Sequence, residues 1–489
     1  MSHFPADEYK AIVNELRKLP SETEWVEFKS NRAVGDSIGE YISALSNSAT
    51  LCHQNVAYMI WGIDDKNHDI IGTTFQPKAA KHGNENLENW ISHLLSPVVN
   101  FYFIELVIDG KRIVLLEIDP ASNRPVSFIN QEFIRVGSYK KPLKDYPEKE
   151  RELWKIFENT PFESRTVMTN CSDEKVLALL DYPAFFDLLK MPLPDGRTNI
   201  LYYLEQDRLI SKNIAGTWDI LALGAILFAK KLSNFERVKR KAVRIIQYDG
   251  KGKIKTLREE MFDMGYAASF ELLTKYIMTL LPANEVIEQA FRKSVPMFPN
   301  LAIRELLANA LIHQDFFSSG TGPMIELFED RIEISNPGVP LVSIDRFLDS
   351  PPRSRNESIA SLMRRFGICE ERGSGIDKVV FVTEFYQLPA PLFEQVEDSA
   401  TRVTLFAHKN FKDMDKADKL RACYLHACLQ YVKKEPMTNS TVRARFGIGD
   451  KNSAMVSRIL KDAVSAKLIR VQDDQVGSKA KKYLPFWVD

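Results

Sequence analysis

The stretch RELLANALIHQDF, residues 304–316, combines an apolar helix pattern with a regular set of polar side chains. Glu305, Asn309 and His313 recur at intervals of four, so they lie on one face of the predicted helix. Leucine and alanine at most of the intervening positions supply apolar faces beside them. A carboxylate flanked by apolar surface requires a metal, a water or a ligand as its partner. We interpret this face either as a binding surface or as the solvated edge of an amphipathic helix.

Length and composition are those of a multidomain protein. The 489 residues exceed what one hydrophobic core holds, and Lys plus Arg equal Asp plus Glu at 65 each. The five cysteines show no CxxC pairing, which is typical of reduced thiols in a cytoplasmic protein. No apolar run is long enough to span a bilayer. We expect a cytoplasmic protein without a membrane partner, which attracts nucleic acid only through local charge.

The order of predicted elements indicates a multidomain α+β protein. Residues 1–145 alternate strands and helices, with a hairpin turn at Asp109-Gly110, and predict a compact α+β domain. Residues 146–284 are expected to be mostly helical, with a strand at KAVRIIQYDG and a long helix around 257–281.

The remaining chain predicts two further domains. Residues 285–408 contain the opening helix, two strands around a turn at Glu329-Asp330, and a glycine turn before a second helix, which together predict an α/β sandwich. Residues 410–489 carry 16 Lys or Arg against 9 Asp or Glu, and three helices followed by two short strands predict a winged helix.

The runs RELLANALIHQDF, ELFEDRIEISNPG, ERGSGIDKV and ATRVTLF together resemble the GHKL ATP-binding fold, in the divergent form found beside Schlafen-type domains. The resemblance implies that Glu305 is the general base for water and that Asn309 holds Mg²⁺, an ion that prefers hard oxygen ligands. His313 occupies the next turn, either as a phosphate contact or as a packed histidine.

The same resemblance implies how the rest of the nucleotide is held. A glycine turn at the start of a helix offers free backbone N–H groups to phosphate. Where the family usually has Asp-x-Gly against adenine, this chain has Asn-Pro-Gly, which makes the choice of nucleotide less certain. Arg355, in a lid-like loop, contacts phosphate or lies in solvent. The expected nucleotide-binding residues are Asn309, His313, Asn336, Gly338, Arg355, Gly373, Ser374, Gly375 and, at the adenine end, Thr404.

The runs SETEWVEFKSN, ISALSNSA, YMIWGIDDKNHDIIG and RPVSFINQEFIRVGS resemble the AlbA-type Schlafen domain over roughly residues 15–145. In Schlafen nucleases two glutamates and an aspartate hold a divalent metal that cleaves RNA, and many relatives only bind nucleic acid. The resemblance implies a Mg²⁺ or Mn²⁺ site and a phosphate-stabilising lysine, with Arg135 as a further phosphate contact. The matching positions are Glu22, Glu27, Asp64 or Asp65, and Lys29.

The C-terminal run TNSTVRARFGIGDKNSAMVSRILKDAVSAKLIR resembles a winged helix-turn-helix. Its third helix is expected to bury Val456, Ile459, Leu460 and Val464 and to present its other face to the major groove of DNA. A basic wing would contact backbone phosphate, although the same fold also serves protein interactions. The expected nucleic-acid-binding residues are Asn452, Ser453, Ser457, Arg458, Lys461, Lys481 and Lys482.

These patterns support two functions. The first is an ATP-binding transcriptional regulator, expected to be a homo-oligomer, in which ATP changes how the outer domains bind DNA or RNA. The alternative is an ATP-gated, metal-dependent endoribonuclease, for example one that cleaves tRNA in antiphage defence. ATPase activity of the GHKL type is compatible with both. A P-loop helicase is excluded because no GxxxxGK[ST] motif is present.

Overall fold

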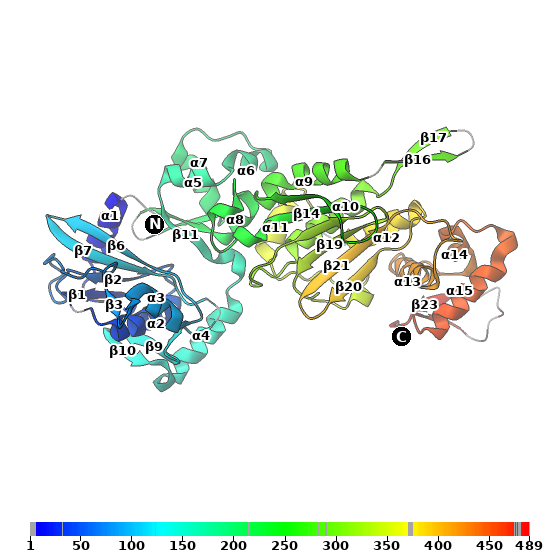
Figure 1. The fold of residues 1–489 in the computed structure, drawn as a ribbon. Coiled ribbons are helices and arrows are strands. Elements are labelled where there is room, and N and C mark those ends of the chain that lie inside the picture. The colour runs from blue at the N-terminus through cyan, green and yellow to red at the C-terminus, as the bar shows by residue number, and fades with distance from the viewer. Residues whose placement is uncertain are drawn as a thin grey trace. The chain divides into compact units, whose positions relative to one another are not determined.

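The computed structural model describes residues 6–31, 33–122, 124–213, 216–281, 283–288, 291–369, 375–473, 475, 477 and 481–488 (Figure 1). The chain forms two compact units, and each is made from two stretches of sequence. The first unit contains residues 1–178 and 196–222, and the second contains residues 179–195 and 223–489. The predicted division into four domains is finer than this and stays a prediction.

The first unit is built on a four-stranded sheet in the order β1-β2-β7-β6, with β1 and β2 parallel and the other neighbours antiparallel. A second sheet has the order β10-β9-β8-β5, and a third has the order β11-β13-β12. The strands are β1 (Val26–Lys29), β2 (Ala57–Trp61), β3 (Lys81–His82), β4 (Glu85–Asn86), β5 (Leu95–Ser96), β6 (Phe101–Ile108), β7 (Lys111–Ile118), β8 (Ser127–Phe128), β9 (Gln131–Val136), β10 (Tyr139–Pro142), β11 (Thr166–Cys171), β12 (Ile210–Lys212) and β13 (Trp218–Leu221).

Both faces of the first sheet are covered, which explains why all five residues of β2 are buried. Apolar residues of α1 pack on one face, and apolar residues of α2 and α3 pack on the other. The predicted hairpin turn is confirmed, because Asp109 and Gly110 both have positive φ between β6 and β7. The helices of this unit are α1 (Ala6–Leu16), α2 (Gly35–Leu51), α3 (Leu87–Leu94), α4 (Pro147–Asn159), α5 (Asp173–Leu179) and α7 (Arg197–Gln206).

Polar side chains of α2 tie this helix to the hairpin of β8 and β9. Asn47 donates to the carbonyl oxygens of Val126 and Phe133 at 2.9 and 2.8 Å, and its own oxygen accepts from Val126 N at 2.7 Å. The Ser43 hydroxyl donates to Val126 O and accepts from Phe133 N. Because these groups are buried and paired, the asparagine of the ISALSNSA motif holds the fold together.

The second unit contains a six-stranded sheet in the order β15-β14-β18-β19-β21-β20, in which only β14 and β18 are parallel neighbours. In Figure 1, α9, α10 and α12 lie along this sheet. The sheet strands are β14 (Val243–Tyr248), β15 (Thr256–Phe262), β18 (Met324–Leu327), β19 (Arg331–Pro337), β20 (Leu392–Val396) and β21 (Ala400–Phe406), with a separate hairpin of β16 (Ala283–Glu288) and β17 (Phe291–Pro296). The helices here are α6 (Tyr182–Leu189), α8 (Ala222–Phe228), α9 (Tyr266–Leu280), α10 (Asn300–Ile312), α11 (Glu357–Arg365) and α12 (Gly375–Phe385).

The long helix predicted around 257–281 is only partly correct. Residues 256–262 form β15, which pairs antiparallel with β14, and α9 begins at Tyr266. The segment TLREEMF contains good helix formers, so local propensity favours a helix there, and pairing at the sheet edge overrides it. The strand predicted at KAVRIIQYDG is confirmed as β14.

The last part of the chain folds as three helices and a pair of short strands. These are α13 (Lys416–Val432), α14 (Asn439–Arg445), α15 (Ser453–Ser465), β22 (Ile469–Val471) and β23 (Tyr483–Pro485). Their order agrees with the three helices and two short strands that the sequence predicts for this region. The winged-helix assignment itself stays a prediction. In the parts of the chain that the structure describes, no helix is long and apolar enough to cross a bilayer.

The buried Glu117 on β7 predicts how the stability of the folded protein depends on pH. Burial, with Asp119 and Asp219, raises the pKa of the Glu117 carboxyl to about 8. Below that pH the folded protein keeps a proton that an unfolded carboxyl loses above roughly pH 4.3, so stability falls as pH rises through 8. We expect Glu117→Gln to raise Tm clearly at about pH 8.5 and little at about pH 5, measured by differential scanning fluorimetry. Glu105→Gln, at a partly exposed position on β6, serves as the control. An equal shift at both pH values would contradict this account.

Candidate functional site

A cavity of about 190 Å³ lies in the second unit, beside α10 and the middle of the six-stranded sheet. Its walls are mostly apolar, and a few polar groups enter it, which is the usual character of a small-molecule site. The cavity is lined by Leu306, Asn309, Ala310, His313, Ile334, Asn336, Val339, Pro340, Leu341, Val342, Phe347, Ser350, Pro351, Pro352, Arg353, Arg355, Gly375, Ile376, Thr401 and Val403.

The polar face of α10 reaches this cavity. Asn309 and His313 line it directly. Glu305, one turn earlier, is 8% exposed, and its Oε2 lies 2.8 Å from the point where a Cβ on Gly375 would stand. Because a Cβ never approaches so closely, position 375 requires glycine as long as Glu305 keeps this orientation. The structure therefore brings together Glu305, Asn309 and Gly375. Gly373 and Ser374 lie outside the described residues.

Two paired strands form the floor of the cavity, and their alternation decides which side chains enter it. Ile334 on β19 pairs with Val403 on β21, and Asn336 pairs with Thr401. All four line the cavity. The Nδ2 group of Asn336 donates to Pro337 O at 3.1 Å, and the Thr401 hydroxyl donates to Gly338 O at 2.8 Å.

The assignment of Thr404 to the adenine end is a correction that follows from this alternation. Thr404 pairs with Glu333, is 4% exposed and does not line the cavity. One residue along a strand changes the face of the sheet. Glu333 belongs to a buried charged group on that other face, where it contacts Arg331 and Lys253. Thr401, and not Thr404, therefore lines the cavity, and the alternation of ATRVTLF was the signal for it.

Gly338 and Arg355 form the bend beyond β19. Gly338 has φ +101, and a Cβ there would meet the Arg355 guanidinium at 2.4 Å. Arg355 donates to the carbonyl oxygen of Val339, so part of its hydrogen-bonding capacity is used by the loop. Burial, together with Arg355, lowers the pKa of His313 to about 4. His313 is therefore neutral at pH 7 in this arrangement.

In the first unit, Glu22 and Glu27 meet at one guanidinium. Arg135 is fully buried and pairs with Glu27, and its Nη2 lies 3.4 Å from Glu22 Oε2. Glu27 also pairs with Lys29, and Glu22 accepts from Phe28 N at 2.9 Å. Burial lowers the pKa of Arg135, and the pairing with carboxylates opposes that effect. The two glutamates are thus structural partners of the buried Arg135 guanidinium.

The aspartates predicted to join them lie in a separate turn. Asp64 accepts from the backbone N–H groups of Lys66 and Asn67 at 3.0 and 3.2 Å, and these bonds lower its pKa. Asp65 is exposed. Among the described residues, no group of three or more His, Cys, Asp or Glu side chains is placed to hold a metal ion. The Mg²⁺ or Mn²⁺ site predicted here gains no support from the geometry.

The face predicted to contact DNA is exposed on α15. The helix buries Val456, Ile459, Leu460 and Ala463, so Ala463 takes the place predicted for Val464. Asn439 donates to the Ser457 hydroxyl at 3.1 Å, which links α14 to this face. Asn452, Ser453, Ser457, Arg458, Lys461 and Lys482 are exposed, and Lys481 is partly exposed.

Comparisons with known proteins agree with two of the predicted domains. Residues 22–144 match the family model "Schlafen, AlbA_2". Residues 320–405 match a second model, HATPase_c_4, described as "Putative ATP-dependent DNA helicase recG C-terminal". The chain therefore contains a Schlafen AlbA_2 domain and an ATPase-like domain, which indicates a function related to nucleotides and nucleic acids. Helix α10, with Glu305, Asn309 and His313, precedes the second match.

Matches to whole proteins are weaker. The comparison with curated proteins found no match. One solved structure, the DIP2311 protein from Corynebacterium diphtheriae, is 15% identical and covers 98% of this chain and 97% of its own, with a TM-score of 0.42. A likeness at that level carries no functional argument.

The arrangement of Arg135 and Glu27 predicts a large effect on stability. Removing one partner of a buried ion pair leaves the other charge uncompensated, at a cost of about 3–5 kcal/mol. We expect Glu27→Gln and Arg135→Met each to lower the free energy of unfolding by about that amount, measured by urea denaturation. The double variant Glu27→Leu/Arg135→Met should recover much of the loss. Single variants as stable as the wild type would show that the pair has no structural role.

Proposed function

We propose that this protein is an ATP-binding regulator whose nucleotide state controls how it binds nucleic acid. The observation that carries the proposal is that the C-terminal helices contact the same two elements that wall the cavity beside α10. A ligand in that cavity would therefore act on elements that also hold the C-terminal region.

The residues around the cavity fit an adenine nucleotide with Mg²⁺. The Asn309 amide supplies a hard oxygen of the kind that Mg²⁺ accepts. Glu305 lies one turn away, where a carboxylate can take a proton from water. The start of α12 at Gly375 brings helix N–H groups to the cavity, and such groups attract phosphate. At the other end, Asn336 and Thr401 offer polar groups between apolar walls to an adenine ring.

The first shared element is α12. Its beginning, Gly375 and Ile376, lines the cavity. Near its end, Glu384 lies 3.1 Å from Nδ1 of His426 on α13 and 3.5 Å from Nε of Arg445 on α14. Arg445 is 4% exposed and also donates to Leu388 O at 2.7 Å. One helix therefore joins the predicted phosphate end of the cavity to a largely buried charged contact with the C-terminal region.

The second shared element is the loop that covers the cavity, residues 339–355. Phe347 lines the cavity, while its neighbours Asp345 and Arg346 contact the C-terminal region. The Tyr424 hydroxyl donates to Asp345 O, and the Arg346 guanidinium lies 4.8 Å from the centre of the Trp487 ring. Trp487 Nε1 donates to the Tyr424 hydroxyl at 3.1 Å. The loop is thus held on one side by cavity residues and on the other by Tyr424 and Trp487.

Coupling follows if the nucleotide prefers one position of these elements. A ligand shifts a conformational equilibrium only by its difference in affinity for the two states, and the effect is reciprocal between the two ligands. DNA bound by α15 would therefore change ATP affinity by the same factor by which ATP changes DNA affinity. The exposed basic face of α15 is the surface that we propose for DNA, and the Schlafen AlbA_2 domain is the one that we propose for RNA or DNA. We include homo-oligomerisation in the same proposal.

A metal-dependent ribonuclease remains the second candidate, and no specific observation favours it. Glu22 and Glu27 are engaged with Arg135, and Asp64 caps a turn. Cleavage assays with Glu27→Gln also require a stability control, because this substitution breaks a buried ion pair.

The test measures DNA binding by the full chain with and without ATP and Mg²⁺. We expect ATP to change the affinity for labelled duplex DNA by about 5- to 150-fold in the wild type, as measured by fluorescence anisotropy. Gly375→Ala should weaken this response, because its Cβ would displace the Glu305 carboxylate from its position beside the cavity. Gly252→Ala is the matched control, because a Cβ there meets open space and φ is ordinary.

A second variant tests the connection itself. Glu384→Gln weakens the contact with His426 and Arg445 outside the cavity. We expect it to bind ATP as the wild type does, by isothermal titration calorimetry, and to lose most of the effect of ATP on DNA binding. No ATP binding by the wild type would overturn the proposed function. Binding of both ligands without mutual effect would overturn only the coupling. Cleavage of tRNA, added to parallel incubations with Mg²⁺ and ATP, would establish the ribonuclease.

A further inference from the structure

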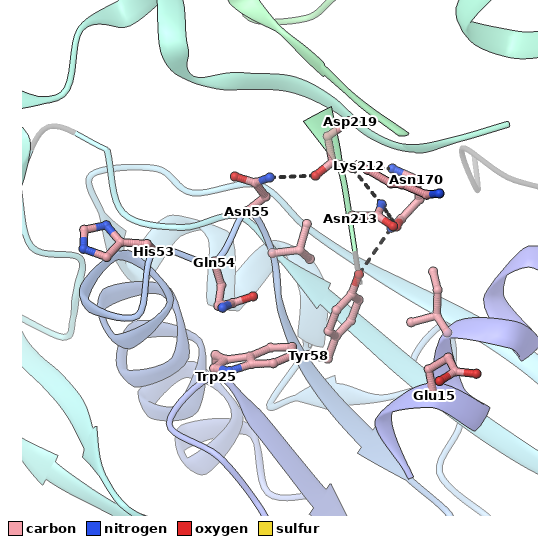
Figure 2. A pocket seen from close by; sticks show the side chains of 12 residues that line it. Glu15, Trp25, His53, Gln54, Asn55, Tyr58, Asn170, Lys212, Asn213 and Asp219 are labelled. Carbon is pink, nitrogen blue, oxygen red and sulfur yellow. Dashed lines mark hydrogen bonds between the residues drawn. The ribbon is translucent and has the colours of Figure 1, made fainter. Parts of the chain in front are cut away.

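A second cavity, of about 180 Å³, lies within the first unit (Figure 2). It forms where α1 and the loop before β2 meet the three-stranded sheet of β11, β13 and β12. None of the residues assigned above lines it. Its lining consists of Ile12, Glu15, Trp25, His53, Gln54, Asn55, Val56, Tyr58, Asn170, Lys212, Asn213 and Asp219.

One wall is a fixed network of amides around a buried carboxylate. Asp219 is 1% exposed and accepts from Asn55 Nδ2, Asn170 N and Asn213 Nδ2 at 2.8, 2.9 and 2.9 Å. Burial raises the pKa of Asp219, and these three bonds oppose that effect. Such a network costs free energy to bury and holds its members in one arrangement.

The same network fixes the orientation of Tyr58. Asn170 adopts a left-handed backbone with φ +51, and its Nδ2 donates to the Tyr58 hydroxyl at 3.2 Å. Asn213 Nδ2 donates to Asn170 Oδ1 at 2.8 Å. Figure 2 shows these bonds running from Asn55 through Asp219 and Asn170 to the Tyr58 ring. Polar edges and an aromatic face are thus held in place before any ligand arrives.

The opposite wall is an indole. Trp25 is partly exposed, and its ring centre lies 6.5 Å from that of Tyr58 at an angle of 60°. In Figure 2 the Gln54 amide lies near the Trp25 ring. The exposed Lys212 carries the cation at the rim, with its Nζ 5.7 Å from the Trp218 ring centre.

These features select a class of ligand. An aromatic surface, a fixed polar wall and one cation at the rim are the kinds of group with which proteins hold an unstacked base and its phosphate. A base inside a duplex would first have to leave the stack to reach this cavity.

We infer that this cavity receives a single unstacked base of a single-stranded nucleic acid, with Trp25 as the stacking surface and Lys212 beside the adjoining phosphate. The inference rests on the proposed function and deepens it, because it states which form of nucleic acid the first unit binds. Binding here would depend on the base as well as on the backbone.

The test uses the full chain carrying both Arg458→Ala and Lys461→Ala, so that α15 contributes little to nucleic-acid binding. The probes are a labelled single strand, as DNA and as RNA, and an abasic strand with the same backbone. Their affinities are measured by fluorescence anisotropy. We expect the ordinary strand to bind more tightly than the abasic strand. Trp25→Leu should weaken binding of the ordinary strand about 5- to 100-fold and remove the difference between the two strands. Lys212→Gln should weaken both strands alike.

Two controls separate recognition from folding. Trp25 also packs against the apolar core, so Trp25→Phe, which keeps a ring, should restore most of the binding and the preference. Trp154→Leu, at an exposed tryptophan on α4, should change neither. A single strand bound equally well by Trp25→Leu, or bound no better than the abasic strand, would overturn the inference alone. Binding of duplex DNA by the unmodified chain without any binding of single strands would do the same. No nucleic-acid binding of any kind would overturn the proposed function as well.

Discussion

The contact between Glu305 and Gly375 sets the arrangement of the ATPase-like domain. The carboxylate end of Glu305 on α10 lies 2.8 Å from the point where a Cβ at position 375 would stand, so any side chain there would displace it. This packing places Asn309 and the start of α12 at one cavity, and it gives α12 a direction. At its far end, Glu384 then meets His426 and Arg445. The position of the C-terminal helices is therefore linked, through α12, to the packing of Glu305 against Gly375.

Local pattern predicted the elements well where the pattern lies within one element. The four-residue spacing of Glu305, Asn309 and His313 placed them on one helix face, and the last two of these line the cavity. The hairpin at Asp109-Gly110 followed from residues that tolerate positive φ. Strand β15 was mistaken for a helix because its residues favour a helix, and its partner β14 decides otherwise.

Predictions of chemistry depend on distant residues that spacing along the chain does not reveal. Glu22 and Glu27 have the spacing of a metal site, and Arg135, more than a hundred residues later, turns them into the lining of a buried cation. No spacing in the sequence reveals that partner. Thr401 and Thr404 are three residues apart on β21, and the choice between them depends on which face of this strand meets α10. The cavity beside Trp25 was not predicted, since Asn170, Asn213 and Asp219 are ordinary polar residues until β11, β12 and β13 pair.

The two compact units interleave along the chain. Residues 179–195 belong to the second unit, and the chain then returns to complete the first with residues 196–222. Strand β11 precedes this excursion, and its neighbour β13 follows it. A fragment that stops at residue 178 would carry β11 without its partner and would expose a sheet edge that invites aggregation. Truncation at one point cannot separate the units, and a recombination event that exchanged either of them intact between genes would need more than a single crossover.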